Sequence, residues 1–269
     1  MAGESTVDLV RAQLRRLRIA AGMSQEEFGK RVHNSGSQVS AVELGQRPLD
    51  KSFLARADEV LQTGGLLVSL LKLAERDGEP VWFRPWLEAE RAARQLRLFE
   101  PVLIPGLLQA ENYARAVLRT DDTLSSDEVD RRVAARLERQ AILTADNPPQ
   151  VFVVLDERTL RQTSDGLSGI MAEQVAHLIA LAEQPHVHIH VIPAATSLHI
   201  GSSGPFALAR SADGGWVGHL ENQLGGVVVD REDGVAALLA RWEGVRNEAL
   251  PRRQSSDLMK EVQSQHGPQ

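Results

Sequence analysis

The sequence predicts a multidomain protein: an all-α head, a helical connector and a mixed α/β (α+β) body. Three observations support this division. The chain has 269 residues, which is long for one domain when about 150 residues is typical. Apolar residues follow helical steps of three and four at the start and form strand-length runs after residue 149. Residues 1–72 carry ten Lys and Arg against eight Asp and Glu, a net +2, and the remaining residues are net −8.

The composition is that of an ordinary globular protein, with 42% hydrophobic, 25% charged and 4% aromatic residues. The absence of cysteine excludes disulfides, thiolate catalysis and sulfur-ligated zinc. The first residues lack the order of a signal peptide, and no apolar run reaches the 18 or so residues of a membrane span. We therefore expect a cytoplasmic protein with no membrane partner.

Five short helices are expected in the head. The first has apolar residues at helical spacing and ends at Gly22. Ser24 and Glu27 form a capping box for the second, and Ser35 is the expected N-cap of the third. The predicted helices span 7–20, 25–32, 36–44, 52–61 and 66–76.

The body follows a hinge at Asp77–Pro80, where turn residues cluster. Helices are expected at 82–99, 105–119, 126–143, 168–184 and 232–250. Strands are expected at 151–155, 187–192, 205–210, 216–220 and 226–229, with an extended segment at 99–105. The polar residues after Leu250 suggest a frayed or disordered tail. The predicted domains are therefore 1–76, 77–250 and a polar C-terminal tail, 251–269.

The segment LRRLRIAAGMSQEEFGKRVHNSGSQVSAVELGQRP, Leu14–Pro48, predicts two short helices joined by a tight turn. It resembles the Cro and lambda-repressor-like helix-turn-helix of the xenobiotic-response-element (XRE) family of regulators. The matching positions are Gly22–Glu27, Val32, Val39, Val42 and Glu43–Gly45. The resemblance runs to about Leu61 and implies double-stranded DNA as the partner, with the third helix of the head in the major groove.

The resemblance also assigns roles to residues of the head. Those expected to contact base edges or the DNA backbone are Gln25, Ser35, Gly36, Ser37, Gln38, Ser40, Ala41, Gln46 and Arg47. Gln38 is the best candidate to read adenine, because an amide can both donate and accept. Gln25 suits a phosphate, although it is also an ordinary first residue of a helix. Arg18 and Glu43 are expected to form a structural pair inside the head.

The recognition helix departs from many relatives because it carries neither Arg nor Lys. Affinity that depends on neutralising phosphates should therefore be weak in one head and should gain from dimerisation. Gly36 lowers helix propensity by about 1 kcal/mol relative to Ala. We therefore expect the first turn of this helix to become ordered on DNA.

Most of the body, from Trp82 to about Leu250, resembles the antitoxin-like domain of unknown function that follows this helix-turn-helix in many actinobacterial regulators. The matching blocks are Trp82-Phe83, Glu88–Glu90, Phe99–Pro101, Ile104–Leu118, Arg136–Leu143, Val153–Arg161, Val187–Pro193 and Ser203–Arg210. The resemblance implies a small protein partner encoded by a neighbouring gene. It implies no particular ligand.

Aromatic residues near the start of the body form a possible ligand or partner surface: Trp82, Phe83, Trp86 and Tyr113. The first three can close a pocket, and they equally suit an apolar hinge. The helical spacing around Tyr113 is more typical of core or interface packing than of cofactor binding.

His186, His188 and His190 alternate along a predicted strand and share one face, where His199 or His219 can complete a zinc site. The same pattern suits a polar sheet face, and no HExxH motif accompanies it. Gly201–Phe206 lacks the GxSxG elbow, and the chain has neither a P-loop nor GxGxxG. We therefore expect no enzyme activity, no cofactor and no metal.

The resulting hypothesis is a DNA-binding transcriptional regulator whose body dimerises and responds to a ligand or a small protein. A homodimer predicts an inverted-repeat operator. The alternative is an antitoxin-like protein that neutralises a small protein and autoregulates its operon. A metallo-enzyme with a DNA-binding head is a distant third.

Overall fold

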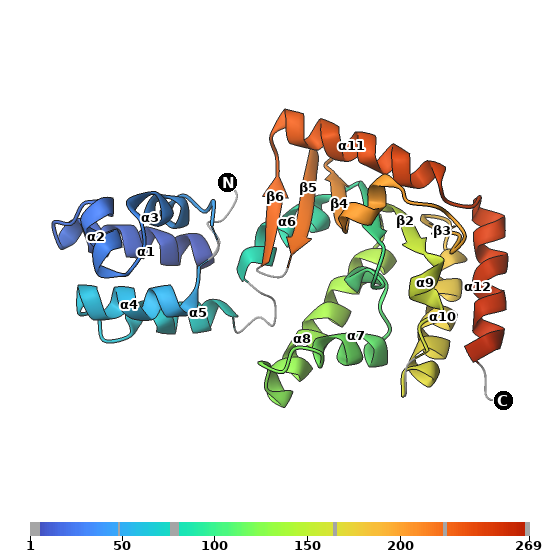
Figure 1. Cartoon of the computed structure of the whole chain (residues 1–269), viewed down its shortest axis with the longest axis horizontal. Coiled ribbons are helices and arrows are strands. Elements are labelled where there is room, and N and C mark those ends of the chain that lie inside the picture. The colour runs from blue at the N-terminus through green and yellow to red at the C-terminus, as the bar shows by residue number, and fades with distance from the viewer. Residues whose placement is uncertain (1–5, 48, 76–80, 164–165, 223–224, 267–269) are drawn as a thin grey trace. The chain divides into compact units, whose positions relative to one another are not determined.

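The computed structural model describes residues 6–47, 49–75, 81–163, 166–222 and 225–266 (Figure 1). It consists of two compact units, Met1–Arg84 and Pro85–Gln269. The predicted boundary after residue 76 is N-terminal to this division. The predicted hinge at Asp77–Pro80 lies outside the described residues.

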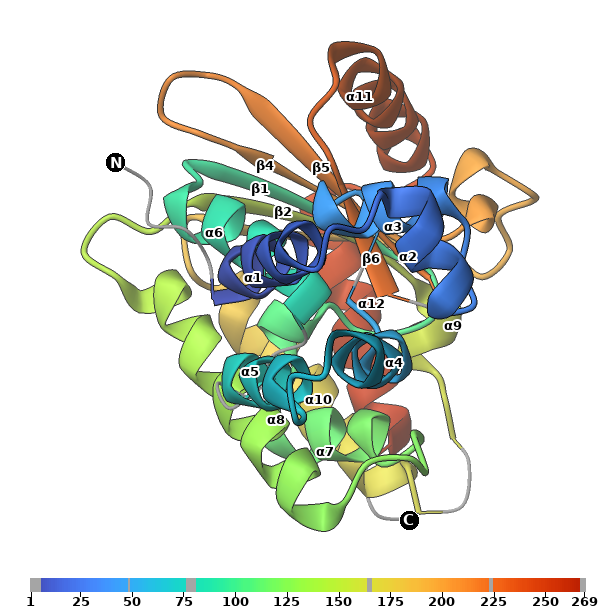
Figure 2. The ribbon, with the colours of Figure 1, turned by 90° about the vertical axis from the view of Figure 1, so that its left-hand side faces the viewer.

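The first unit contains the five predicted helices, and each observed end is within one residue of its prediction. They are α1 (Thr6–Ala20), α2 (Gln25–Arg31), α3 (Gly36–Glu43), α4 (Lys51–Leu61) and α5 (Leu66–Glu75). Figure 2 looks onto this unit, with α2 and α3 side by side and α4 and α5 below α1. The helices enclose one apolar core, in which Leu14, Phe28, Val39, Leu54 and Leu67 have no exposed surface.

The second unit, which we call the body, is built on a six-stranded mixed sheet in the order β3-β2-β1-β4-β5-β6. The strands are β1 (Gln95–Glu100), β2 (Gln150–Asp156), β3 (Val187–Ile192), β4 (Phe206–Arg210), β5 (Trp216–Asn222) and β6 (Gly225–Val229). Strands β1, β2 and β3 are parallel, whereas β4, β5 and β6 pair antiparallel. The expected α+β class is therefore confirmed.

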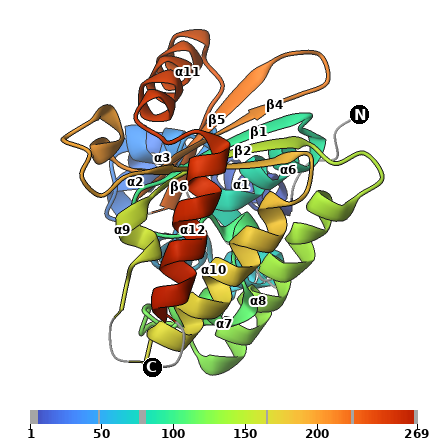
Figure 3. The ribbon, with the colours of Figure 1, turned by 90° about the vertical axis from the view of Figure 1, so that its right-hand side faces the viewer.

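Helices lie on both faces of this sheet. The longer ones are α6 (Arg84–Ala92), α7 (Glu111–Leu118), α8 (Ser126–Arg139), α10 (Ser168–Ala182), α11 (Glu232–Asn247) and α12 (Arg252–His266). The short ones are η2 (Gly106–Leu108), η3 (Gln140–Thr144), α9 (Glu157–Leu160) and η4 (Ile200–Ser203), whereas η1 (Val81–Phe83) belongs to the first unit. Helix α11 lies on one face, and α7, α8 and α10 lie on the other (Figures 1 and 3). None of the described helices is long and apolar enough to cross a membrane.

The prediction of one helix over residues 82–99 is wrong. The chain forms α6 and then the central strand β1, which pairs with both β2 and β4. From Gln95 to Leu98 polar and apolar residues alternate, and Leu96 and Leu98 are buried. This period of two is typical of a strand, and pairing on both sides stabilises it.

The prediction of a frayed polar tail is also wrong. Residues 252–266 form α12, which buries Ser255, Met259, Val262 and His266. It lies beside α10 and the β3 edge of the sheet (Figure 3). The spacing of the buried residues by four, three and four places them on one side of the helix.

Candidate nucleic-acid interface

The position of α3 is fixed by the tight turn that joins it to α2. His33, in this turn, has a left-handed backbone with φ of 59°. Arg56 of α4 reaches across, and its Nε donates a hydrogen bond of 2.9 Å to the carbonyl oxygen of Val32. A Cβ on Gly29 would lie 2.8 Å from the carbonyl oxygen of Asn34, so a larger residue would displace the turn.

Gly36, the first residue of α3, packs closely against α2. A Cβ at this position would lie 3.0 Å from the Cα of Glu26, so glycine allows α2 and α3 to approach closely. The structure has α3 helical from Gly36 onward. This differs from the expectation of a first turn that becomes ordered on DNA, because a capping box and close packing already hold it.

The predicted DNA contacts lie on or next to the outward side of α3. Val39 and Val42 are buried beneath the helix. The expected base-facing residues that retain exposed surface are Ser35, Gly36, Ser37, Gln38, Ser40 and Ala41, and Gln46 and Arg47 are exposed just after the helix. Because Ser40 and Ala41 lie three and four residues after Ser37, both neighbour Ser37 on the surface of the helix.

Gln38 also caps the start of α3, a role that the sequence analysis did not predict. Its backbone N–H donates to Ser35 Oγ at 3.2 Å, and its side-chain Oε1 accepts from the Ser35 backbone N–H at 2.9 Å. The motif Ser-x-x-Gln at residues 35–38 was the available signal for this capping box. Bidentate reading of adenine uses both atoms of the amide, so Gln38 would share its Oε1 between the Ser35 N–H and the base in that mode.

The predicted structural pair is present beneath the recognition helix. The Nε and Nη2 atoms of Arg18 lie 2.6 and 3.0 Å from the two carboxylate oxygens of Glu43, and both side chains are almost fully buried. This hydrogen bonding raises the pKa of Arg18 above its ordinary value. Gln25 donates from Nε2 to Glu43 at 2.8 Å, and Arg18 Nη1 donates to the carbonyl oxygen of Met23 at 2.7 Å. The network joins α1, α2 and α3. One N–H of the Gln25 amide is used by Glu43, and the second N–H is the one that a phosphate contact would use.

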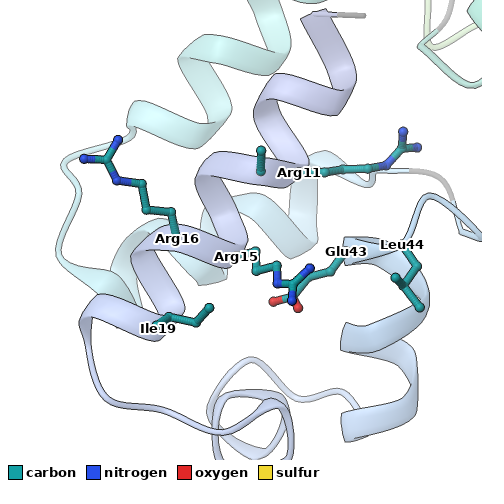
Figure 4. A pocket seen from close by; sticks show the side chains of 7 residues that line it. Arg11, Arg15, Arg16, Ile19, Glu43 and Leu44 are labelled. Carbon is teal, nitrogen blue, oxygen red and sulfur yellow. The ribbon is translucent and has the colours of Figure 1, made fainter. Parts of the chain in front are cut away.

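A hollow between α1 and the end of α3 is lined in part by arginines of α1 that the sequence analysis did not assign to DNA contact (Figure 4). Its lining consists of Arg11, Ala12, Arg15, Arg16, Ile19, Glu43 and Leu44. Arg15 and Arg16 are exposed, and Arg11 lies against Gly45, just beyond α3. The helical spacing of Arg11 and Arg15 was a signal in the sequence. The cations near the end of α3 thus come from α1 and from Arg47, and Lys30 of α2 lies near the start of α3.

Two of the four aromatic residues proposed as a ligand or partner surface are buried. Trp86 and Tyr113 are each 2% exposed, so the prediction is wrong for these two. Trp86 stacks on His219 with ring centroids 5.3 Å apart, and the Tyr113 hydroxyl accepts from the Ile104 N–H. Trp82 and Phe83 are half-buried and contact each other edge to face.

The histidines of the body have separate partners. Nε2 of His186 lies 2.9 Å from the carbonyl oxygen of Leu143, and Nδ1 of His190 lies 3.0 Å from that of Leu250. His188 stacks on Phe152. His199 accepts from the Gly201 N–H, and burial, with Arg139 nearby, lowers the pKa of His219 to about 4. Among the residues that the structure describes, no three His, Cys, Asp or Glu side chains are grouped as metal ligands.

A polar pocket in the body lies where β1 and β2 end. Its lining residues are Pro101, Asp156, Arg158, Thr196, Ser197, Leu198, His199 and Ser202. Arg158 donates to Asp156 at 2.9 Å and to the carbonyl oxygen of Ala194 at 2.6 Å, which ties the loop after β3 to the strand ends. The loops that contribute to this pocket or adjoin it carry exposed apolar side chains: Val102, Leu103, Leu198 and Ile200. Sequence periodicity missed the pocket because its residues come from separate segments.

Comparison with protein families gives two matches. Residues 10–71 match the model of a helix-turn-helix domain. Residues 83–261 match the family described as "Domain of unknown function (DUF5753)". Neither the curated proteins nor the solved structures give a match for this chain.

The head therefore places the chain in the class of helix-turn-helix proteins, in agreement with the geometry of α2 and α3. The second match covers most of the chain and includes α12 up to residue 261. The chain belongs to the DUF5753 family.

Proposed function

We propose that this chain is a DNA-binding transcription regulator of the XRE type, acting in the cytoplasm as a homodimer on an inverted-repeat operator. The observation that carries the proposal is the outward face of α3, where Ser37, Ser40 and Ala41 are accessible on a helix held by its caps and by α2. Small polar and methyl-bearing side chains contact base edges and thymine methyl groups in a major groove.

The charges of the head support a division in which α3 contacts the bases and arginines outside α3 attract the phosphates. Bases are read by a helix without Arg or Lys, and phosphates are attracted by Arg11, Arg15 and Arg16 of α1 and by Arg47. Each head has few such cations, so one head binds weakly and two heads on neighbouring half-sites bind well. The body, with a net charge of −8 outside residues 1–72, is repelled by DNA.

The body, in this proposal, carries the response to a ligand or a small protein. The polar pocket at the ends of β1 and β2 supports a ligand, because such strand ends commonly bind small molecules in α/β sheets. The exposed side chains of Val102, Leu103, Leu198 and Ile200 favour a protein partner and support the antitoxin-like alternative. Binding to the body would change operator affinity through the relative placement of two heads.

Two substitutions at Gln38 test DNA reading separately from folding. Gln38→Glu keeps a side-chain acceptor for the Ser35 N–H, so α3 stays capped while a negative charge enters the DNA-facing surface. Gln38→Ala loses both the cap and the amide. We expect both variants to lose operator affinity, Gln38→Ala by about 1–3 kcal/mol with relaxed specificity at one position.

The measurement is a binding titration on an operator selected from random sequence, together with thermal unfolding. Glu59→Gln, an exposed change on α4, is the control and should leave binding unchanged. Unchanged affinity in Gln38→Glu would show that α3 does not face the bases.

A partner for the body is tested by co-purification with the protein encoded by the neighbouring gene. Val102→Asp with Leu198→Asp should release that protein if the apolar loops hold it, whereas Glu88→Gln should not. If the complex forms and leaves operator affinity unchanged, the neutralising role is favoured over the sensing role.

A further inference from the structure

The two edges of the body sheet differ in how their backbone groups are used. At the β3 edge, the Val191 N–H donates to Ser255 Oγ at 3.0 Å, and the Leu250 N–H donates to the Val191 carbonyl oxygen at 2.9 Å. The segment that leads into α12 therefore covers this edge. The outer side of β6 makes none of the backbone hydrogen bonds found among the described residues.

Strand β6 lacks the features that normally protect an edge. Its sequence, Gly-Gly-Val-Val-Val, contains neither charge nor proline. Alternate residues of an antiparallel edge strand direct their N–H and C=O groups away from the neighbouring strand. The β6 edge is therefore available for pairing with another strand.

A second observation lies beside this edge. Leu220 of β5 and Val227 of β6 are direct cross-strand partners and are 37% and 53% exposed. The next pair on the same face, Gly218 and Val229, is covered by α11. A Cβ added at Gly218 would meet Leu238 of α11, and a Cβ added at Gly234 of α11 would meet Val229. The apolar pair thus lies beyond the part of the sheet that α11 covers.

We propose that two copies of this chain pair β6 with β6 antiparallel about a two-fold axis, joining their sheets, with the two copies of Val227 in contact and Leu220 beside Val227 in each copy. The proposal rests on the proposed homodimer and names its interface. When the two-fold axis passes beside Val227, this residue lies opposite its own copy and the other residues of β6 pair in reverse order. A charge at position 227 would therefore repel itself, and valine does not. Because the body is acidic overall, a neutral edge is a favourable place for two bodies to meet.

The size of this interface sets its expected strength. Five paired residues and one apolar pair from each chain bury less than the roughly 800 Å² per partner of a standard interface. We therefore expect a dimer that dissociates at about micromolar concentration in solution and that is strengthened when both heads bind one operator.

The test is sedimentation equilibrium of the full chain over a range of concentrations. Val227→Lys places like charges across the two-fold axis and should weaken dimerisation at least tenfold. Val102→Lys is the matched control, because Val102 is also on the body and is 60% exposed. It should leave the dimer unchanged, and unchanged circular dichroism should show that both variants are folded.

DNA binding separates failure of this interface from failure of the proposed function. The proposal is supported if Val227→Lys keeps wild-type affinity for a single half-site but loses the gain on an inverted repeat. If Val227→Lys stays dimeric, the interface is elsewhere and the regulator function stands. A wild-type chain that stays monomeric, alone and on an inverted repeat, would overturn both the interface and the homodimer.

Discussion

At the scale of single residues, Glu43 is the side chain on which the geometry of the head depends most. It accepts hydrogen bonds from Arg18 of α1 and Gln25 of α2 while belonging to α3 itself. Glu43→Ala leaves the Arg18 cation buried without its carboxylate, so we expect the head to lose about 3–5 kcal/mol of unfolding free energy.

Urea unfolding followed by far-UV circular dichroism measures this loss. Far-UV circular dichroism reports the helices of both units, and three of the four tryptophans, Trp86, Trp216 and Trp242, lie in the body. A far-UV transition that tryptophan fluorescence does not follow therefore belongs to the head. Glu26→Ala breaks an exposed pair with Lys30 and should leave the head unchanged. Equal effects of the two substitutions would contradict the structural role of Glu43.

Glu100, at the end of β1, gives the body a dependence on pH. Burial, and next the charge of Glu221, raise the pKa of Glu100 to about 8. The folded chain keeps this proton where the unfolded chain, with an ordinary pKa of about 4.5, has lost it. Stability therefore falls by up to about 1.4 kcal/mol per pH unit as the pH rises from about 4.5 to 8.

We expect Glu100→Gln to stabilise the body at pH 8 relative to the wild type and to flatten this fall. Urea unfolding at pH 5 and pH 8, followed by tryptophan fluorescence, checks it. Glu88→Gln, at an exposed position of α6, is the control. A wild-type chain that is equally stable at both pH values, and a Gln variant that changes neither, would show that Glu100 titrates normally.

At the scale of elements, α12 is an integral part of the body. Met259 has no exposed surface, and Ser255 hydrogen-bonds the β3 edge. Met259→Ala removes buried methylene groups and leaves a cavity, so we expect the body to lose about 2–5 kcal/mol. Lys260→Ala changes the next, exposed residue of the same helix and should have no comparable effect. Tryptophan fluorescence in urea is the readout, and equal stability of the two variants would mean that α12 is dispensable.

The elements also show what the sequence alone can predict. The first three head helices were predictable because apolar spacing coincides there with a cap or a terminating glycine, and the other two were predictable from apolar spacing. Strand β1 was missed although Gln95–Leu98 alternates, because a helical pattern from Trp82 was extended through it. Helix α12 was missed because a polar composition hid four buried residues at helical spacing. The arginine hollow and the polar pocket depend on tertiary packing, which short-range patterns do not encode.

At the scale of the whole molecule, the chain consists of two compact units with separate cores. Substitutions in distant cores usually have additive effects on stability. We expect Glu43→Ala to shift the far-UV transition of the head and Met259→Ala to shift the fluorescence transition of the body, with the double variant showing both shifts. Calorimetry of the four proteins checks this, and a single merged transition in the wild type would show that the units unfold together.

The close approach at Gly36 and the cap at Gln38 also limit how this head can be re-engineered for new DNA sequences. A side chain at position 36 collides with α2, and changes at position 38 alter the start of the helix. Ser37, Ser40 and Ala41 carry neither restriction. A library meant to retarget the protein should therefore randomise these three positions and keep the other two, so that altered specificity is selected among folded variants.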